Sequence, residues 1–186
     1  REFHQLVRNS TIPAPRRILD AGCGKGRIGI HLARAGYEVI GFDFVDSAVE
    51  KFRRLAADQA LENRVTVFSQ DINDAWNIPD ASVDCVFAVT VIEDLVREAQ
   101  QRHFKEECLR VLAPQGVFVL EYYTQNDGYY GRLLADSTAS GTILVDPHNT
   151  ISFKIYMERE ITELFGPPLQ PVFKKEFTWQ TTKYDR

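Results

Sequence analysis

Residues 18–26 (ILDAGCGKG) restrict the possible folds of this chain more than any other segment. A short apolar run ends there in a turn that carries Gly22, Gly24 and Gly26, and apolar residues then recur at helical spacing. Glycine permits a positive φ and leaves no Cβ between the backbone and a ligand. A helix that begins at such a turn also presents unpaired backbone N–H groups and a partial positive charge. The pattern therefore predicts a strand, a ligand-binding turn and a helix in succession.

Strands and helices alternate along most of the chain. Apolar or alternating runs predict six strands, at residues 17–20, 37–43, 64–69, 83–89, 117–123 and 172–179. Helical periodicity predicts helices at residues 27–35, 47–60, 95–112 and 158–165. This alternation is typical of an α/β fold, in which a mostly parallel sheet has helices on both faces.

Length and charge limit the class of protein further. A chain of 186 residues predicts one domain, residues 1–186, and the long polar, glycine-rich segment 124–150 predicts a lid-like insertion in it. The 22 basic and 26 acidic residues give a net charge of −4 without a basic segment, so we expect no nucleic-acid partner. No apolar run approaches the roughly 20 residues that cross a bilayer, so we expect no membrane partner.

The cysteines and the first residues indicate the compartment. Cys23, Cys85 and Cys108 are widely spaced, which predicts reduced thiols in a cytoplasmic protein and neither a disulfide framework nor a metal site. The chain begins at Arg1 without methionine and without the apolar segment of a signal peptide. We expect a fragment or a trimmed chain.

Asp43 ends the second predicted strand and indicates the kind of ligand. A carboxylate at this position can accept hydrogen bonds from both ribose hydroxyls of a nucleoside. Residues 24–29 (GKGRIG) also match the dinucleotide pattern GxGxxG. The glycine turn and Asp43 predict an adenosine-type ligand, and they do not choose between a nicotinamide dinucleotide and another adenosine derivative.

Four segments resemble motifs of the class I S-adenosylmethionine-dependent methyltransferases. Residues 19–26 (LDAGCGKG) resemble the first motif, and residues 39–43 (VIGFD) resemble the second motif with its ribose-binding acid. Residues 69–72 (SQDI) are similar to the end of the third strand, and residues 109–116 (LRVLAPQG) to the turn before the fifth. The resemblance implies a Rossmann-like fold and the small-molecule branch of the family, near the ubiquinone-biosynthesis type.

The resemblance also implies S-adenosylmethionine as cofactor and methyl transfer to a small-molecule acceptor. Asp71 would accept from the adenine amine, and the amide of Ile72 would donate to a ring nitrogen. Asp20 would repel a phosphate but suits a sulfonium-bearing amino acid, which favours this cofactor over a dinucleotide. The predicted cofactor-binding set is Asp20, Gly22, Gly24, Gly26, Asp43, Phe44, Asp71, Ile72 and Val89.

Methyl transfer depends mainly on in-line positioning, so the lack of an obvious catalytic triad is no objection. Glu93 and His148 are candidate bases. Glu93 equally fits a carboxylate at the positive end of a helix, and a lone loop histidine such as His148 is more often polar surface. Asp94 stands where quinone-type members often carry histidine. The aromatic residues predicted to contact the acceptor are Tyr122, Tyr123 and Tyr129.

The sequence is also consistent with two other functions, and it departs from the family pattern in one respect. The rivals are a nicotinamide-dependent oxidoreductase and a methyltransferase fold that binds without catalysis. The family sheet usually ends in a seventh, antiparallel strand, but only a short polar stretch follows Trp179. Either the chain is truncated before this strand or the sheet edge is completed otherwise, for which a homodimer is one alternative.

Overall fold

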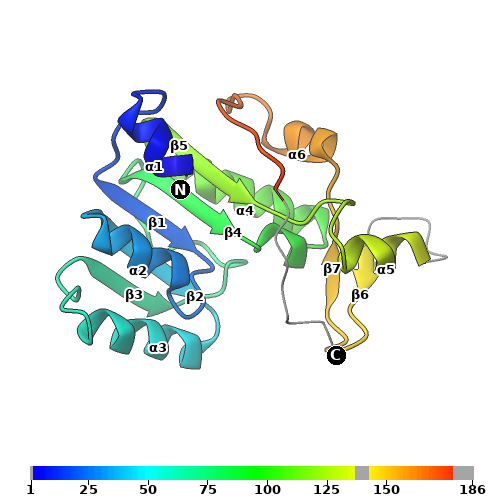
Figure 1. Cartoon of the computed structure of the whole chain (residues 1–186), viewed down its shortest axis with the longest axis horizontal. Coiled ribbons are helices and arrows are strands. Elements are labelled where there is room, and N and C mark those ends of the chain that lie inside the picture. Colours follow the sequence, from blue (N-terminus) through cyan, green and yellow to red (C-terminus); the bar gives the residue numbers. More distant parts are fainter. Residues whose placement is uncertain (1, 137–142, 178–186) are drawn as a thin grey trace. The chain divides into compact units, whose positions relative to one another are not determined.

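The computed structural model describes residues 2–136 and 143–177, and the chain divides into two compact units (Figure 1). The first unit consists of Arg1–Val91 and Arg102–Glu121. The second consists of Ile92–Gln101 and Tyr122–Arg186. The prediction of a single domain with an insertion at residues 124–150 stays a prediction.

A five-stranded, wholly parallel sheet forms the centre of the first unit. Its strands follow the order β3-β2-β1-β4-β5. Their bounds are β1 Arg17–Ala21, β2 Glu38–Asp43, β3 Val65–Ser69, β4 Val83–Val89 and β5 Leu112–Glu121. The register pairs Asp43 with Ser69 and Val89 with Glu121, so the carboxyl ends of the strands lie along one edge of the sheet.

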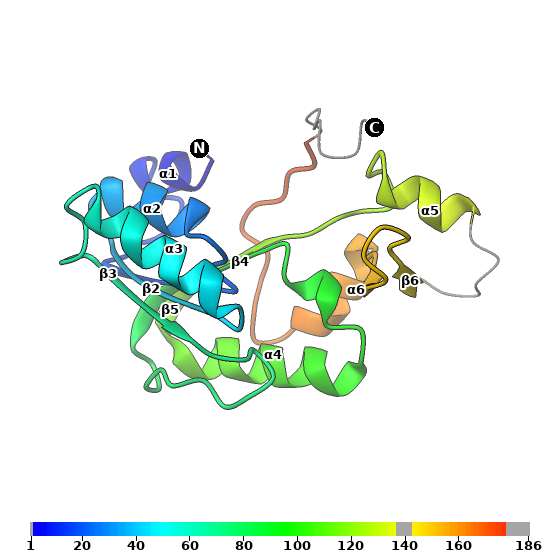
Figure 2. The same ribbon diagram turned by 90° about the horizontal axis from the view of Figure 1, so that it is seen from below.

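Helices cover both faces of this sheet, which confirms the predicted α/β fold. Figure 2 shows α2 (Arg27–Arg34) and α3 (Asp46–Ala57) on one face and α4 (Glu98–Val111) on the other. A further helix, α1 (Glu2–Arg8), lies on the same side as α2. Right-handed crossovers through such helices are the usual way to connect parallel strands.

The side chains of the strands alternate between two apolar layers. On the face of α2 and α3, Ile18 and Cys85 are fully buried and pack with the fully buried ring of Phe52. On the face of α4, an aromatic row runs through Trp76, Phe104 and Phe118, with edge-to-face centroid distances of 5.7 and 6.2 Å. Burial on both faces explains why these strands are apolar runs in the sequence.

The second unit contains short elements and an antiparallel hairpin. Its elements are the 3-10 turn Ile92–Asp94, the first residues of α4, α5 (Tyr130–Asp136), β6 (Ile143–Val145), β7 (Ser152–Lys154) and α6 (Glu158–Phe165). Leu144 of β6 and Phe153 of β7 are buried partners in the hairpin and pack with Tyr130. The hairpin begins inside the segment that we predicted as a lid-like insertion. Its strands have three residues each, too few to show an alternation of apolar and polar residues in the sequence.

The predicted sixth strand at residues 172–179 is wrong for the part that the structure describes. Residues 172–177 form no strand, and residues 178–179 lie outside the described ranges. The side chains of Val172 and Phe173 are 62% and 47% exposed, so the alternation of this segment does not reflect a buried face. Among the described residues, antiparallel pairing occurs only in the β6–β7 hairpin, and no helix there is long and apolar enough to cross a membrane.

Candidate functional site

The carboxyl edge of the sheet in the first unit brings the predicted cofactor residues together. The glycine turn follows β1, Asp43 ends β2, and Val89 ends β4. Asp71 and Ile72 follow β3 after Gln70, beyond the pairing of β3 with β2. In an open parallel sheet, this edge is where ligands bind.

The three glycines of the turn have positive φ angles but serve different purposes. At Gly22, with φ 71°, an added Cβ would come within 2.6 Å of Val91 Cγ2. At Gly26, with φ 83°, it would come within 2.2 Å of Phe52 Cδ2. Only Gly24, with φ 52°, has no atom within 4 Å of the added Cβ. Close packing therefore explains two of the glycines, and Gly24 alone leaves backbone surface open to a ligand.

Backbone amides of the turn already have partners in the protein. Those of Gly22 and Cys23 both donate to the carbonyl of Phe42, at 3.0 and 2.9 Å. The amide of Gly26 donates to the carbonyl of Cys23 at 3.0 Å. The amide of Gly24 donates to Oδ2 of Asp43 at 2.8 Å, so a carboxylate stands where an anionic ligand would meet that amide. This arrangement leaves the Gly24 amide unavailable to a phosphate and places a negative charge beside it, which disfavours a diphosphate at this amide.

Asp43 is held in place by two backbone amides. Besides the bond from Gly24, its Oδ1 accepts from the amide of Val45 at 2.9 Å. Each carboxylate oxygen can accept a further hydrogen bond, so Asp43 keeps acceptor capacity for a ligand. The next side chain, Phe44, is 72% exposed, which makes an aromatic face available beside the acid.

Asp20 lies beneath the turn and not on its surface. It is only 2% exposed, and its Oδ2 has no hydrogen-bond partner in the described part of the chain. A Cβ at Gly29 would lie 3.2 Å from this oxygen, so the carboxyl is directed toward α2. Burial raises the pKa of Asp20 to about 7, although the Gly29 amide and the positive charge of Arg27 act in the opposite direction. A direct contact between Asp20 and a ligand stays a prediction.

Asp20→Asn is expected to remove a pH dependence of stability. Because the pKa of Asp20 is higher in the folded protein than in the unfolded chain, its contribution is fully present below about pH 4 and is lost as the pH rises toward 7. Between pH 5 and pH 8 the parent protein should lose about 3 kcal/mol through this group, at 1.36 kcal/mol per pKa unit. Urea unfolding of both proteins at the two pH values measures the difference. Parallel pH profiles of the two proteins would contradict the expectation.

The third strand ends in a turn that orders Asp71. Its Oδ1 accepts from both the backbone amide and the side-chain amide of Asn73, each at 2.8 Å. The indole Nε1 of Trp76 donates to the carbonyl of Ile72 at 3.1 Å. Asp71 is exposed and Ile72 half-buried. The turn therefore has a defined shape, and the adenine contacts of Asp71 and Ile72 stay a prediction.

Glu121 is a further acid at this edge that the sequence did not reveal. It ends β5 opposite Val89, and its carbonyl accepts from the amide of Thr90 at 2.9 Å. Burial raises the pKa of the Glu121 carboxyl, while the positive charge of Arg27 lowers it. Glu121 was hidden within an apolar run, and only the register of the sheet could have singled it out.

The candidates for catalysis and substrate contact belong to the second unit. Glu93 is 3% exposed, and its Oε1 accepts from the backbone amide of Tyr123 at 2.8 Å. The structure thus brings Glu93 and Tyr123 together and gives the carboxylate a structural role there. The ring of Tyr122 contacts that of Tyr156 at a centroid distance of 6.4 Å.

Tyr129 and His148 also lie together. Their rings stack at a centroid distance of 5.9 Å. Asp146, which is 3% exposed, accepts from the hydroxyl of Tyr129 at 3.4 Å and from the backbone amide of His148 at 2.8 Å. Asp146 therefore fixes the loop that carries His148. No group of three or more metal-ligating side chains occurs among residues 2–136 and 143–177.

Comparison with known proteins places this geometry in a family. Residues 18–116, more than half of the chain, match the family model described as a methyltransferase domain. The chain belongs to this methyltransferase domain family. Membership agrees with the resemblance that the sequence motifs indicated. The family and its fold imply S-adenosylmethionine as the cofactor. The narrower ubiquinone-type branch stays a prediction.

Relatives and solved structures support this membership. The methyltransferase domain is 38% identical over 107 residues to a probable S-adenosylmethionine-dependent methyltransferase of Mycolicibacterium smegmatis, covering 58% of this chain and 38% of the relative. It is 34% identical over 110 residues to the S-adenosyl-L-methionine-dependent Diels-Alderase iccD of Talaromyces variabilis, covering 59% and 37%. The chain thus matches less than half the length of these relatives.

The fold itself is shared with a methyltransferase of known structure. A SAM-dependent methyltransferase from Methanosarcina mazei superposes with a TM-score of 0.70 at 23% identity, covering 85% of this chain and 81% of that one. At this identity the likeness concerns the fold alone.

Proposed function

We propose that the carboxyl edge of the first unit binds S-adenosylmethionine and that the protein transfers its methyl group to a small-molecule acceptor. One observation carries the choice of ligand: Asp43 accepts from the amide of Gly24, so the turn presents a carboxylate to the ligand. The ribose hydroxyls of an adenosyl group are neutral donors and suit this carboxylate, whereas a diphosphate does not.

The residues along the edge fit the parts of the cofactor. Asp43 would hold the ribose, and the exposed ring of Phe44 offers a face for the adenine. The open backbone at Gly24 leaves room for the methionine portion. A cationic group bound there would favour the ionised form of the buried Asp20 carboxyl beneath the turn, whereas an anion would disfavour it. When bound, S-adenosylmethionine supplies an activated sulfonium methyl.

Residues of the second unit are the candidates for contact with the acceptor. The aromatic side chains of Tyr122, Tyr123 and Tyr129 are half-buried and suit a flat organic acceptor. The imidazole of His148 could take a proton from an acceptor hydroxyl or amine. Glu93 already holds the amide of Tyr123, so we assign it to positioning of that residue.

Calorimetric titration with S-adenosylhomocysteine tests the proposed cofactor. We expect binding to one site per chain in the micromolar range. NADH, titrated under the same conditions, should bind at least about a hundredfold more weakly, because the Gly24 amide is taken by Asp43. Tight NADH binding with no detectable binding of S-adenosylhomocysteine would overturn the proposal in favour of an oxidoreductase.

The relative named as a Diels-Alderase supports a second candidate, a cofactor-dependent enzyme that transfers no methyl group. Both candidates predict binding of S-adenosylhomocysteine, so the reaction itself must be followed. Methyl transfer predicts that isotope from methyl-labelled S-adenosylmethionine appears in the product. Conversion of an acceptor without incorporation of the label would favour the second candidate.

A further inference from the structure

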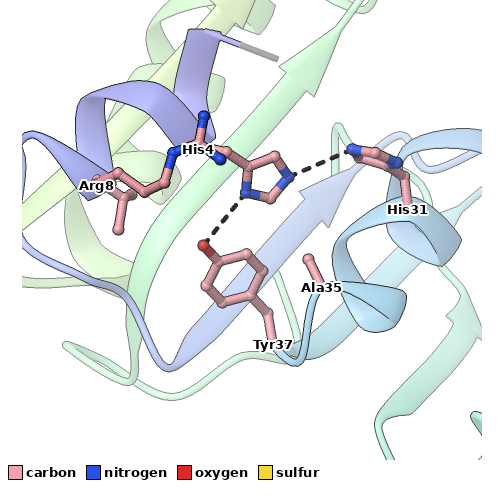
Figure 3. A pocket seen from close by; sticks show the side chains of 6 residues that line it. His4, Arg8, His31, Ala35 and Tyr37 are labelled. Atoms are coloured by element: carbon pink, nitrogen blue, oxygen red, sulfur yellow. Dashed lines mark hydrogen bonds between the residues drawn. The ribbon is translucent and has the colours of Figure 1, made fainter.

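A cavity of about 510 Å³ lies in the first unit, between α1 and the end of α2 (Figure 3). It is lined by His4, Val7, Arg8, His31, Ala35 and Tyr37. Protein pockets that bind small organic ligands usually measure 300–1,000 Å³. The cavity therefore has the size for a small organic molecule.

This cavity is separate from the proposed cofactor site. Tyr37 immediately precedes β2, whereas Asp43 ends the same strand. A strand rises about 3.3 Å per residue, so the two ends of β2 are roughly 17 Å apart. A ligand in the cavity would lie toward the amino ends of the strands and the cofactor at their carboxyl ends.

A chain of hydrogen bonds joins three of the lining side chains (Figure 3). The hydroxyl of Tyr37 lies 3.4 Å from Nδ1 of His4, and Nε2 of His4 lies 3.3 Å from Nε2 of His31. The rings of His4 and Tyr37 also stack, at a centroid distance of 5.7 Å and an interplanar angle of 8°. Both distances are satisfied when Tyr37 donates to a neutral His4 and His4 donates to a neutral His31.

Arg8 carries the only fixed charge among the described residues that line the cavity. Arg8 lines it, no aspartate or glutamate does, and Arg8 makes no ion pair with an acid in the described part of the chain. Burial lowers the pKa of His4, and the nearby His31 and Arg8 lower it further. An anion bound in the cavity would raise the pKa of His4.

We propose that the cavity binds a small organic oxyanion, a carboxylate or phosphate monoester with an apolar body. Its oxyanion would pair with Arg8 and would replace Nε2 of His31 as the acceptor of the hydrogen bond from Nε2 of His4. Its body would pack on Val7, Ala35 and the ring of Tyr37. This site goes beyond the proposed methyl transfer and does not depend on it.

Binding of such a ligand is coupled to the uptake of a proton. The negative charge favours the imidazolium form of His4, which can donate from both nitrogens. Since the pKa of His4 is low in the free protein and rises in the complex, affinity increases as the pH falls through the range in which histidine titrates.

Titration with phenyl phosphate tests the proposed charge recognition, with benzoate as the carboxylate arm and phenol as the neutral control. We expect one site per chain for either anion and at least about tenfold weaker binding of phenol. Arg8→Gln should weaken binding of the anions about tenfold. Arg34→Gln removes the same charge from an exposed position of α2 that does not line the cavity, and it should leave binding unchanged. Equal effects of the two variants, or equal binding of phenol, would overturn the proposal.

Proton uptake tests the part assigned to His4. Titrations near pH 7 in two buffers with different ionisation enthalpies should show protons taken up by the parent protein and markedly fewer by His4→Gln. Saturating S-adenosylhomocysteine should change neither the affinity for the anion nor the proton uptake.

The 3.3 Å spacing of Nε2 of His4 and Nε2 of His31 also fits two ligands of one transition-metal ion. Binding of Zn²⁺ that requires both histidines, without binding of either anion, would contradict the proposal.

Discussion

Asp43→Ala is expected to weaken binding of S-adenosylhomocysteine by about a hundredfold. The substitution removes the acceptor for the ribose hydroxyls, and each hydrogen bond to a charged group contributes roughly 1.5–3 kcal/mol. A loss of about 3 kcal/mol corresponds to about a hundredfold in the dissociation constant. The same change frees the amides of Gly24 and Val45, which Asp43 now holds at 2.8 and 2.9 Å. Calorimetric titration measures the effect directly.

Two further variants separate this binding role from a role in folding. Asp43→Asn keeps one carbonyl acceptor and should bind with intermediate affinity. Asp46→Ala removes an exposed acid three positions further along, at the start of α3, and should bind like the parent protein. All variants should retain the far-ultraviolet circular dichroism of the parent. A folded Asp43→Ala protein with parental affinity would show that the ribose is held elsewhere.

Gly26→Ala is expected to lower the free energy of unfolding by about 3–4 kcal/mol. The new Cβ would lie 2.2 Å from a ring carbon of Phe52, which is fully buried. The ring cannot easily move, because Gly29 and Gly41 also pack against it without space for a Cβ. Overpacking of this kind costs about 1–3 kcal/mol, and an alanine at positive φ costs about 1–2 kcal/mol more.

Gly24→Ala serves as the matched substitution in the same turn. Its Cβ would meet no atom within 4 Å, so urea unfolding should show only the cost of alanine at positive φ, about 1–2 kcal/mol. Because the Cβ would occupy the surface left open for the ligand, binding of S-adenosylhomocysteine should fall more than tenfold. The account fails if Gly24→Ala destabilises the fold as much as Gly26→Ala does, or if it leaves binding unchanged.

Buried, regular elements could be predicted from the sequence with nearly correct bounds. The strand Val83–Val89 and the helix Glu158–Phe165 match their expected ranges, because a strand buried on both faces is an apolar run and because Gly166 follows the helix. Strand β5 begins at Leu112 and not at residue 117, and it therefore contains Pro114. As an edge strand, β5 has fewer ladder bonds to lose at a proline.

Features that depend on contacts distant in sequence could not be predicted. The β6–β7 hairpin has only one buried side chain in each strand, Leu144 and Phe153, which gives no visible period. The segment at residues 172–177 alternates but pairs with no strand. The cavity near α1 joins His4 to His31, which lie 27 positions apart in the sequence.

The glycine turn shows both the strength and the weakness of motif reasoning. Its position at the carboxyl edge of β1 was predicted from spacing alone. The expected positive φ occurs at all three glycines, whereas the expected access of a ligand to the backbone applies in the structure only to Gly24. Gly22 and Gly26 are required by Val91 and Phe52, residues that no local pattern connects to the turn.

A crystal structure with S-adenosylhomocysteine bound tests the central proposal most directly. We expect the ribose hydroxyls within about 3 Å of the Asp43 carboxylate and the homocysteine portion over Gly24. The hydrogen bond from the Gly24 amide to Asp43 should persist in the complex. Density for the ligand elsewhere on the protein, or an Asp43 carboxylate turned away from the ribose, would contradict the account.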